Sequence, residues 1–238
     1  MNFEGKNVLI IGGSSGIGLS VVKQLQAQKA VVYLISRSSS EEWGADVHFL
    51  SADVTGEMGE VEAFLPPQLH GLVYSVGSIN LKPFNRLTVD DFMTDMQLNL
   101  FGAVKVIQQA LKQLKNAVGS SVVLVSSVAA STGMAYHASI AAAKGAVEGF
   151  ALSLASELAP AKIRVNVVAP SLTDTPLAKN LLSTPEKREA SEKRHPLGKI
   201  GKPEDISRAI TFLLSEESEW MTGQVMHVDG GMGNLKML

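Results

Sequence analysis

The stretch from Ser127 to Lys144 gathers side chains that can polarise an oxygen atom and move a proton. A serine hydroxyl donates and accepts hydrogen bonds, and a lysine ammonium donates them. Ile140 lies four residues before Lys144 and has no proton to exchange. Tyr136 and His137 precede it and carry groups that can act as general acids. The stretch therefore predicts a site that holds a substrate oxygen and whose proton donor must be identified.

A glycine-rich turn near the start of the chain follows an apolar run and opens a helical pattern. Glycines at such a turn permit a tight bend, a close approach to a pyrophosphate and close packing of the helix on the sheet. The helix N-terminus adds positive potential for phosphates. Glycine by itself is common at turns, but its place between a strand and a helix indicates a dinucleotide site. The residues expected there are Gly12, Ser14, Ser15, Gly16, Ile17 and Gly18.

The end of the second apolar run, Ser36-Arg37, indicates the type of dinucleotide. An acid at this place binds the ribose 2′-hydroxyl of NAD, whereas an arginine suits the 2′-phosphate of NADP. No carboxylate stands beside Arg37 to repel a phosphate. The alternative is a solvated loop arginine. We therefore expect NADP as the cofactor, with NAD less favoured.

Short β-branched runs alternate with helical patterns along the whole chain, and several runs are apolar throughout, as in strands buried on both faces. This order predicts an α/β fold with a three-layer, doubly wound parallel sheet of the Rossmann type. We see one domain over residues 1–238. Strands are expected at 8–11, 31–35, 47–50, 72–74, 122–125, 163–168 and 224–228, and helices near 16–29, 57–65, 88–116, 138–158 and 203–215.

Two helix starts and two short connections add detail. Thr88 and Asp91 have the spacing of a capping box, and Pro203 suits the first turn of a helix. Residues 36–46 leave hardly enough length for a crossover helix. The link over residues 53–72 is also short.

The composition excludes several classes of protein. The chain has 238 residues, 45% of them hydrophobic and 18% charged, with a net charge of −2 and no cysteine. No long basic run favours nucleic acid, and no apolar stretch reaches the roughly 18 residues that suggest a membrane span. The histidines have no metal-ligand spacing, so no metal is expected. We expect a soluble, cytoplasmic protein that binds a small molecule.

These motifs, taken together from Gly5 to Gly231, resemble the short-chain dehydrogenase/reductase family. Ile140 stands where the family has the tyrosine of its Tyr-x-x-x-Lys motif. Ser171 replaces the glycine of a Pro-Gly segment. The other positions that match the family's motifs are Asp53 and Val54, which contact adenine in the family, Gly77 of an otherwise altered Asn-Asn-Ala-Gly segment, Asn99, Pro170 and Thr175.

The resemblance implies roles for three of the residues. The family lysine binds the nicotinamide ribose and lowers the pKa of the tyrosine, a role that falls to Lys144. The serine hydrogen-bonds the substrate oxygen, a role that falls to Ser127. The helix asparagine holds a water molecule and supports the lysine, a role that falls to Asn99. The missing tyrosine removes a general acid, which typically contributes about 10²–10⁴-fold in rate.

Three interpretations of Ile140 remain open. Another group replaces the tyrosine: Tyr136 is one candidate, and His137 has the seven-residue spacing to the lysine that enoyl reductases of this superfamily use. Alternatively, substrate or solvent supplies the proton. In the third interpretation, the chain binds NADP(H) with little or no redox turnover, as a sensor or an assembly subunit.

We expect an NADP(H)-dependent oxidoreductase that acts on a small carbonyl or enone, with an altered proton donor. Residues 176–197 lie where family members carry a mobile substrate lid, and Leu177, Leu181 and Leu182 are expected to line a pocket or to pack the lid. The resemblance also implies a homo-oligomer, a dimer or tetramer, built from the helices near 88–116 and 138–158.

Overall fold

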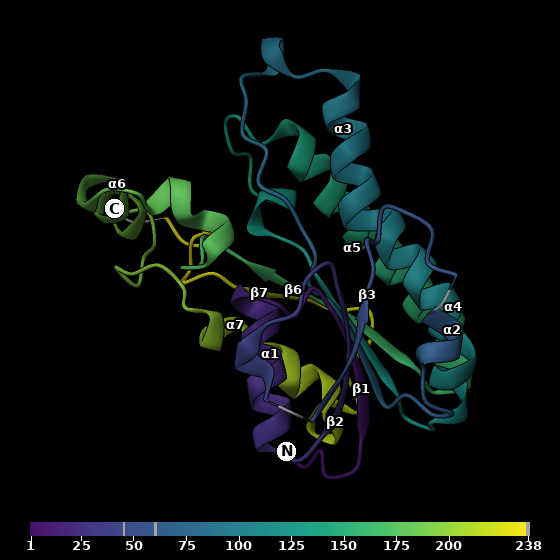
Figure 1. Cartoon of the computed structure of the whole chain (residues 1–238). Coiled ribbons are helices and arrows are strands. Elements are labelled where there is room, and N and C mark those ends of the chain that lie inside the picture. The colour runs from purple at the N-terminus through teal and green to yellow at the C-terminus, as the bar shows by residue number, and fades with distance from the viewer. Residues whose placement is uncertain (45, 60, 237–238) are drawn as a thin grey trace.

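A single seven-stranded parallel sheet forms the centre of the molecule (Figure 1). The computed structural model describes residues 1–44, 46–59 and 61–236. The strand order is β3-β2-β1-β4-β5-β6-β7, so after β3 the chain crosses over to add β4 on the other side of β1. The strands are β1 (Asn7–Ile11), β2 (Val31–Ser36), β3 (Val47–Ser51), β4 (Gly71–Tyr74), β5 (Ser121–Val125), β6 (Arg164–Pro170) and β7 (Val225–Val228). All seven expected strands are confirmed, with ends that differ by one or two residues.

Helices cover both faces of this sheet and complete the three layers that the sequence predicts (Figure 1). One face is covered by α1 (Gly16–Ala27) and α7 (Pro203–Leu214). The other is covered by α4 (Gly102–Asn116) and α5 (Ala138–Leu158), with the short α2 (Val61–Phe64) against α4. The doubly wound fold is therefore confirmed. Single helical turns are η2 (Phe84–Arg86), η4 (Val128–Ala130), η5 (Ala159–Ala161) and η7 (Glu216–Ser218).

The first strand explains why the runs are apolar throughout rather than alternating. Leu9 and Ile11 pack under α4 and α5, while Val8 and Ile10 pack under α1 and α7. All four side chains are completely buried. Burying each such side chain contributes roughly 1.5–3 kcal/mol, so a polar residue on either face would be costly.

The two short connections contain little helix. Among the described residues between β2 and β3, the turn η1 (Glu41–Trp43) is the one helical piece, in agreement with the limited length. Trp43 is buried, and its indole N–H donates a hydrogen bond of 2.9 Å to the carbonyl of Gly13. The helix predicted over 57–65 is too long, because only α2 is helical; residue 60 lies outside the described residues. Gly59 precedes α2 and Pro66 follows it, and neither residue favours a helix interior.

The long helix predicted over 88–116 is interrupted in its middle. It divides into α3 (Val89–Met96), a π-helical turn η3 (Gln97–Phe101) and α4. The expected capping box is present, since the Thr88 hydroxyl accepts from the Asp91 amide and the Asp91 carboxylate accepts from the Thr88 amide. Within the π-turn, the carbonyl of Leu98 accepts a 2.5 Å hydrogen bond from the Tyr74 hydroxyl.

Helix α5 is long and apolar enough to cross a membrane by length and composition alone, over residues 138–161. The expectation that no stretch reaches this threshold is therefore wrong for α5. In the fold, α5 packs against β6 and α3, and Val147, Ala151 and Leu158 belong to the core. Part of its apolar character thus serves the interior, since 39% of the apolar window is buried.

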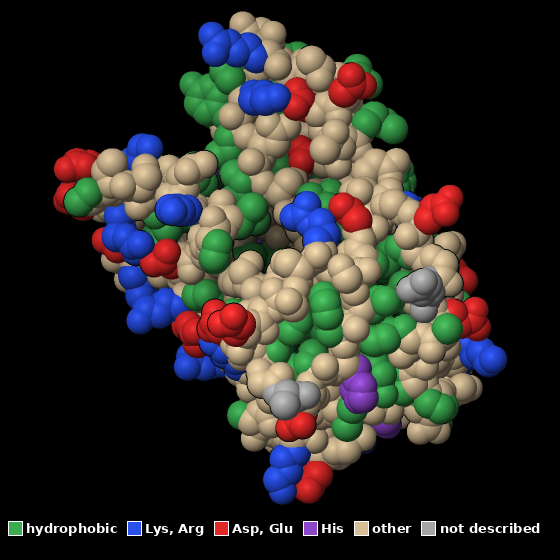
Figure 2. Space-filling view, in the orientation of Figure 1, with side chains coloured by type: hydrophobic (Ala, Val, Ile, Leu, Met, Phe, Trp, Pro, Cys, Tyr) green, Lys and Arg blue, Asp and Glu red, His purple; other side chains and the backbone are tan. Residues whose placement is uncertain are grey.

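An arm of two helical pieces extends from the carboxyl end of β6. It contains η6 (Pro176–Leu182) and α6 (Pro185–Glu192), each starting after a threonine whose hydroxyl accepts from a backbone amide. The sequence marks this region as a lid, and the interleaved charges from Glu186 to Arg194 predict a solvated helix, which α6 confirms. The surface is hollowed between the arm and the end of the molecule that carries α3 (Figure 2).

Candidate active site

Two adjoining cavities open at the carboxyl edge of the sheet, where ligands of doubly wound folds bind. One is a groove of about 300 Å³ over the glycine turn and the ends of β2 and β3. The other is a cavity of about 240 Å³ between β5, β6 and the arm. They form one continuous cleft, since both are lined by Ile17, Ser75, Val76, Gly77, Thr175 and Leu177.

The glycine turn has the backbone that a cradle for phosphates needs. Gly12 and Gly16 have φ of +87° and +55°, a region that side chains disfavour. A Cβ on Gly18 would lie 2.1 Å from the Gly12 carbonyl oxygen, so only glycine fits. Helix α1 begins at Gly16 with no side-chain cap, and its first N–H groups remain available to an anion. The predicted turn residues, Ser14, Ser15 and Ile17 included, all line the groove.

The altered segment after β4 supports this turn by new hydrogen bonds. The Ser75 hydroxyl lies within hydrogen-bonding distance of the carbonyls of Ile11 and Gly12, at 2.9 and 3.1 Å. Tyr74 is buried and binds the π-turn through its hydroxyl, and burial raises the pKa of this phenol. These polar contacts hold the altered segment against the glycine turn and the π-turn. The sequence did not predict them.

Arg37 and Asp53 lie at the adenosine end of the groove, which Val54 also lines. Asp53 accepts hydrogen bonds of 2.9 and 2.7 Å from the amide and hydroxyl of Thr55, which lower the pKa of its carboxyl. The positive charge of Arg37 lowers that pKa further. The guanidinium is thus close to the place where a ribose would lie.

Lys144 is the buried cation of the cleft, with 6% of its surface exposed. Its ammonium donates a hydrogen bond of 2.8 Å to the carbonyl of Val125. Burial lowers the pKa of Lys144 to about 8, against the opposing effect of the Asp95 carboxylate. A Cβ on Gly77 would lie 3.3 Å from the ammonium, so glycine at this place keeps the approach to Lys144 open.

Asn99 lies beside Lys144, and its side chain has one polar atom without a hydrogen-bond partner among the described residues. Its amide nitrogen donates 2.8 Å to the carbonyl of Asp95, while among the described residues its buried Oδ1 has no partner. The same virtual Cβ on Gly77 would lie 3.2 Å from this Oδ1. Oδ1 and the Lys144 ammonium thus face the same small space, where a water molecule or a ribose hydroxyl would satisfy both.

A buried carboxylate stands behind these groups. Asp95 accepts a 2.6 Å hydrogen bond from the hydroxyl of Ser78 and another from that of Ser139. Asn99 also donates to the Ser78 hydroxyl, at 3.3 Å. The network holds the π-turn, the start of α5 and the segment after β4 in one arrangement. Its negative charge also balances part of the charge on Lys144.

Ser127 and Ile140 face the second cavity together with Lys144. The Ser127 Oγ accepts a 3.2 Å hydrogen bond from the Ala129 amide, which leaves its proton for a ligand. Ile140 is 5% exposed and forms part of the wall. The structure thus brings the predicted serine and lysine together and places a hydrocarbon beside them.

Tyr136 is not in this cavity. Its backbone has φ of +68° and its side chain is 61% exposed. It lines a separate surface depression with Lys82 and Phe84. His137, by contrast, lines the cavity, and its Nδ1 lies 2.6 Å from the carbonyl of Ala135. The expected approach of Tyr136 to Ser127 and Lys144 is therefore not found, because the left-handed backbone turns the side chain outward.

The β6 end and the arm close the cavity. Pro170, Thr175 and two of the expected leucines, Leu177 and Leu181, line it, whereas Leu182 is not part of the lining. His195 also lines the cavity, and its Nε2 lies 2.9 Å from the Ser171 hydroxyl. The sequence predicted no role in the site for His195. The only signal for this pair was Ser171 in place of a glycine.

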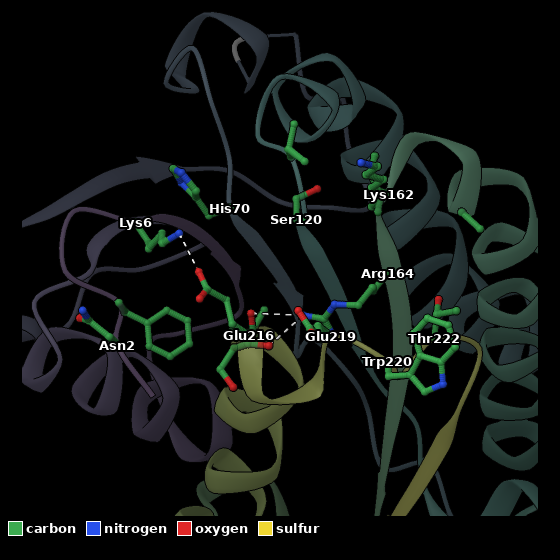
Figure 3. Close-up of a pocket in the computed structure, with 17 residues that line it drawn as sticks. Asn2, Lys6, His70, Ser120, Lys162, Arg164, Glu216, Glu219, Trp220 and Thr222 are labelled. Carbon is green, nitrogen blue, oxygen red and sulfur yellow. Dashed lines mark hydrogen bonds and ion pairs between the residues drawn. The ribbon is translucent and has the colours of Figure 1, made fainter.

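A larger depression of about 810 Å³ lies at the opposite end of the sheet, near the starts of β4, β5 and β6 (Figure 3). Two of its cations already have partners: Lys6 pairs with Glu216 at 3.2 Å, and Arg164 donates to Ser218 and to the carbonyl of Ser215. None of the predicted site residues lines it. No group of metal-ligating side chains is present among the described residues either.

Comparison with known proteins agrees with this geometry. Residues 12–233 match a family described as enoyl-(acyl carrier protein) reductase. A tropinone reductase homologue of Arabidopsis thaliana is 34% identical over 97% of this chain and 94% of its own. The 3-oxoacyl-[acyl-carrier-protein] reductase of Thermotoga maritima is 33% identical over 98% of this chain and 99% of its own.

Two solved structures are similar over almost the whole chain. The aldohexose dehydrogenase of Thermoplasma acidophilum covers 99% of this chain and 97% of its own, with a TM-score of 0.91 and 26% identity. ElxO with NADP bound covers 96% of this chain and 98% of its own, with a TM-score of 0.87 and 29% identity.

Proposed function

This chain belongs to the short-chain dehydrogenase/reductase family of oxidoreductases, and on this basis we propose that it is an NADP(H)-dependent oxidoreductase acting on a small carbonyl or enone. One observation carries the proposal. The buried ammonium of Lys144 and the hydroxyl of Ser127 line a cavity that continues into a groove suited to a dinucleotide. Its proton donor differs from the family tyrosine because Ile140 occupies that position.

The groove fits a dinucleotide phosphate in three respects. The turn from Gly12 to Gly18 lines the groove, and helix α1 starts there with no side-chain cap on its first N–H groups. The unpartnered Oδ1 of Asn99 and the Lys144 ammonium face a space that a ribose hydroxyl would occupy. Arg37 at the adenosine end offers a planar fork for a 2′-phosphate. When bound, the reduced nicotinamide supplies hydride to the substrate.

The residues of the chain orient the substrate and polarise its oxygen. The Ser127 hydroxyl donates to that oxygen, since its own acceptor position is already occupied by the Ala129 amide. The positive charge of Lys144 stabilises negative charge that develops there. The interaction gains strength because the ammonium is buried and poorly screened.

The size and lining of the cavity favour a small, largely apolar substrate. Its volume is about 240 Å³. Hydrocarbon from Ile79, Val128, Met134, Ile140, Leu177 and Leu181 forms much of the wall. The arm that contributes the leucines closes over the substrate and excludes water, which strengthens the electrostatic interactions inside.

Ile140 favours one competing function, the binding of NADP(H) without redox turnover. The residue is buried in the cavity wall and offers no proton. A chain with an intact nucleotide groove and no general acid would report the state of the NADP pool or serve as an assembly subunit.

The two functions are separated by binding and turnover measured on the same protein. A fluorescence titration with NADPH comes first, followed by NADPH oxidation with a panel of small ketones, aldehydes and enones. Oxidation with any of them supports the oxidoreductase. Tight binding with no oxidation across the panel, together with turnover in Ile140→Tyr, supports the binding protein.

We also propose a homo-oligomer that pairs the exposed side of α5. Gly145 and Gly149 have open space where a Cβ would lie, and Ala142 is exposed beside them. Small residues let two helix backbones approach closely. Light scattering after size exclusion tests this: Gly149→Leu shifts a dimer or tetramer toward the monomer, and an unchanged mass would contradict the proposal.

A further inference from the structure

We propose that Ser171 and His195 together supply the proton that Ile140 cannot give. This inference rests on the proposed oxidoreductase function and names the donor in it. Both side chains line the cavity that also contains Ser127 and Lys144. Ser171 touches the substrate oxygen, and His195 replenishes the proton of Ser171 from behind.

The hydrogen bonds of His195 orient its ring. The side chain is only 3% exposed. Its Nδ1 lies 2.8 Å from the carbonyl of Ser191, which can only accept, so Nδ1 carries a proton in either charge state. Its Nε2, 2.9 Å from the Ser171 hydroxyl, is therefore the nitrogen that gains and loses the second proton.

The hydroxyl of Ser171 is placed to pass this proton on. It lies 3.2 Å from the carbonyl of Asp229, an acceptor at the end of β7. When Nε2 is protonated it donates to Ser171, and the hydroxyl proton is directed to Asp229 or to a ligand. A substrate oxygen in the cavity competes with the Asp229 carbonyl for the same proton.

The charged groups around the histidine leave its ring free for this role. Arg194, on the same segment, donates to the Ser191 hydroxyl at 3.0 Å. The carboxylate of Asp229 accepts from the amides of Gly231 and Gly233 at 2.8 and 2.9 Å. From β7, His227 lies behind Gly233. Neither Arg194 nor the Asp229 carboxylate forms a hydrogen bond with the His195 ring.

The step balances as follows. A carbonyl substrate receives hydride at carbon from the reduced nicotinamide, and its oxygen takes the electron pair of the broken π bond. The Ser171 O–H bond breaks and a substrate O–H bond forms. The Nε2–H bond of His195 breaks and restores the Ser171 hydroxyl. Neutral His195 keeps the proton on Nδ1, hydrogen-bonded to the Ser191 carbonyl, and Nε2 recovers its proton from solvent.

His48 provides a control because it is a histidine outside the cleft. It is an exposed residue of β3, and its ring stacks on that of Tyr33 with 4.5 Å between the centroids. We therefore expect His48→Gln to leave proton delivery unchanged.

The experiment measures single-turnover NADPH oxidation with a carbonyl substrate in His195→Gln, Ser171→Ala, Ser171→Thr and His48→Gln. Each variant is made with Ile140 and again with Ile140→Tyr. We expect His195→Gln and Ser171→Ala to slow oxidation by about 10²–10⁴-fold, the usual contribution of a general acid. Ser171→Thr keeps the hydroxyl and retains most of the rate. With Ile140→Tyr, a tyrosine donor is restored and the loss in His195→Gln disappears.

Two further readouts separate this role from a structural one. NADPH affinity by fluorescence stays within about twofold in every variant, because neither residue belongs to the dinucleotide groove. In ¹⁵N NMR spectra of the histidine rings, the resonances of His195 are assigned by their absence in His195→Gln. In the wild type we expect them to show a proton on Nδ1 alone at high pH and on both ring nitrogens at low pH. A ring with only Nε2 protonated overturns the inference.

The failures are distinguishable. Wild-type oxidation that is equally fast in His195→Gln overturns the inference and leaves the proposed function standing. A loss in His195→Gln that persists unchanged with Ile140→Tyr also overturns it, because the defect then lies in folding or substrate binding. Absence of NADPH oxidation in the wild type overturns the proposed function, and the inference with it.

Discussion

The ammonium of Lys144 donates a hydrogen bond to the carbonyl of Val125, the last residue of β5, over 2.8 Å. This contact ties the middle of the site on α5 to the strand that leads directly into Ser127. The lysine therefore keeps its position without help from the residue at position 140. For this reason, the arrangement of the Lys144 ammonium and the Ser127 hydroxyl is compatible with a changed proton donor.

The depressed pKa of Lys144 predicts that cofactor binding weakens in alkali. Burial lowers this pKa to about 8, so the ammonium that attracts the ribose and phosphates becomes neutral as pH rises through about 8. If only the charged form binds, the apparent Kd for NADPH rises roughly fivefold between pH 8 and pH 9. Titrations at constant ionic strength measure this. Lys144→Met should bind more weakly at pH 7 and lose the change between pH 8 and 9; an equal change in both proteins would contradict the assignment.

Arg37→Ala should reduce affinity for NADPH and spare NADH. A charge-assisted hydrogen bond contributes about 1.5–3 kcal/mol, so we expect the Kd for NADPH to rise roughly 10–100-fold and that for NADH to stay within about threefold. Arg208→Ala, on the exposed side of α7, is the control and should change neither. Parallel losses for both nucleotides in Arg37→Ala would show that the guanidinium does not read the 2′-phosphate.

Gly18→Ala should abolish nucleotide binding by closing the glycine turn. The new Cβ would lie 2.1 Å from the Gly12 carbonyl oxygen and 2.6 Å from the Ser75 hydroxyl, so helix α1 must move away from β1. Gly59→Ala places a methyl in open space and serves as the control. Thermal denaturation with and without NADPH measures both, and a normal NADPH-induced rise in Tm for Gly18→Ala would refute this account of the turn.

Tyr136→Phe should leave turnover unchanged within about twofold. The phenol is exposed and lies outside the cavity that holds Ser127 and Lys144. Steady-state kinetics with NADPH and a carbonyl substrate measure kcat directly. A fall of tenfold or more would show that the loop reorganises and that Tyr136 is the displaced acid after all.

Local rules predicted most of the fold. Apolar runs such as the one ending at Ile11 predicted the strands, because a strand that is covered on both faces of the sheet must carry apolar side chains on both faces. The glycines at positions 12, 16 and 18 predicted the turn, because their backbone and close approaches exclude side chains. The spacing of Ser127 and Lys144 likewise predicted two residues that the structure brings to one cavity.

The errors lie where distant segments decide the local structure. The π-turn at Asn99 accepts a hydrogen bond from the hydroxyl of Tyr74 on β4, and no local sequence pattern predicts this turn. Tyr136 faces outward because its backbone takes a left-handed conformation within a loop. His195 meets Ser171 only because the arm folds back over β6. Contacts of this kind depend on tertiary packing and leave little trace in sequence spacing.

The central claim is that the cleft binds NADPH and uses it. Stopped-flow absorbance of the wild-type protein, mixed with NADPH and a panel of small carbonyls and enones, tests both parts in one measurement. The account predicts NADPH oxidation with at least one substrate, and none with that substrate in Lys144→Met at the same concentrations. No oxidation by the wild type, beside clear oxidation by Ile140→Tyr, would contradict the account.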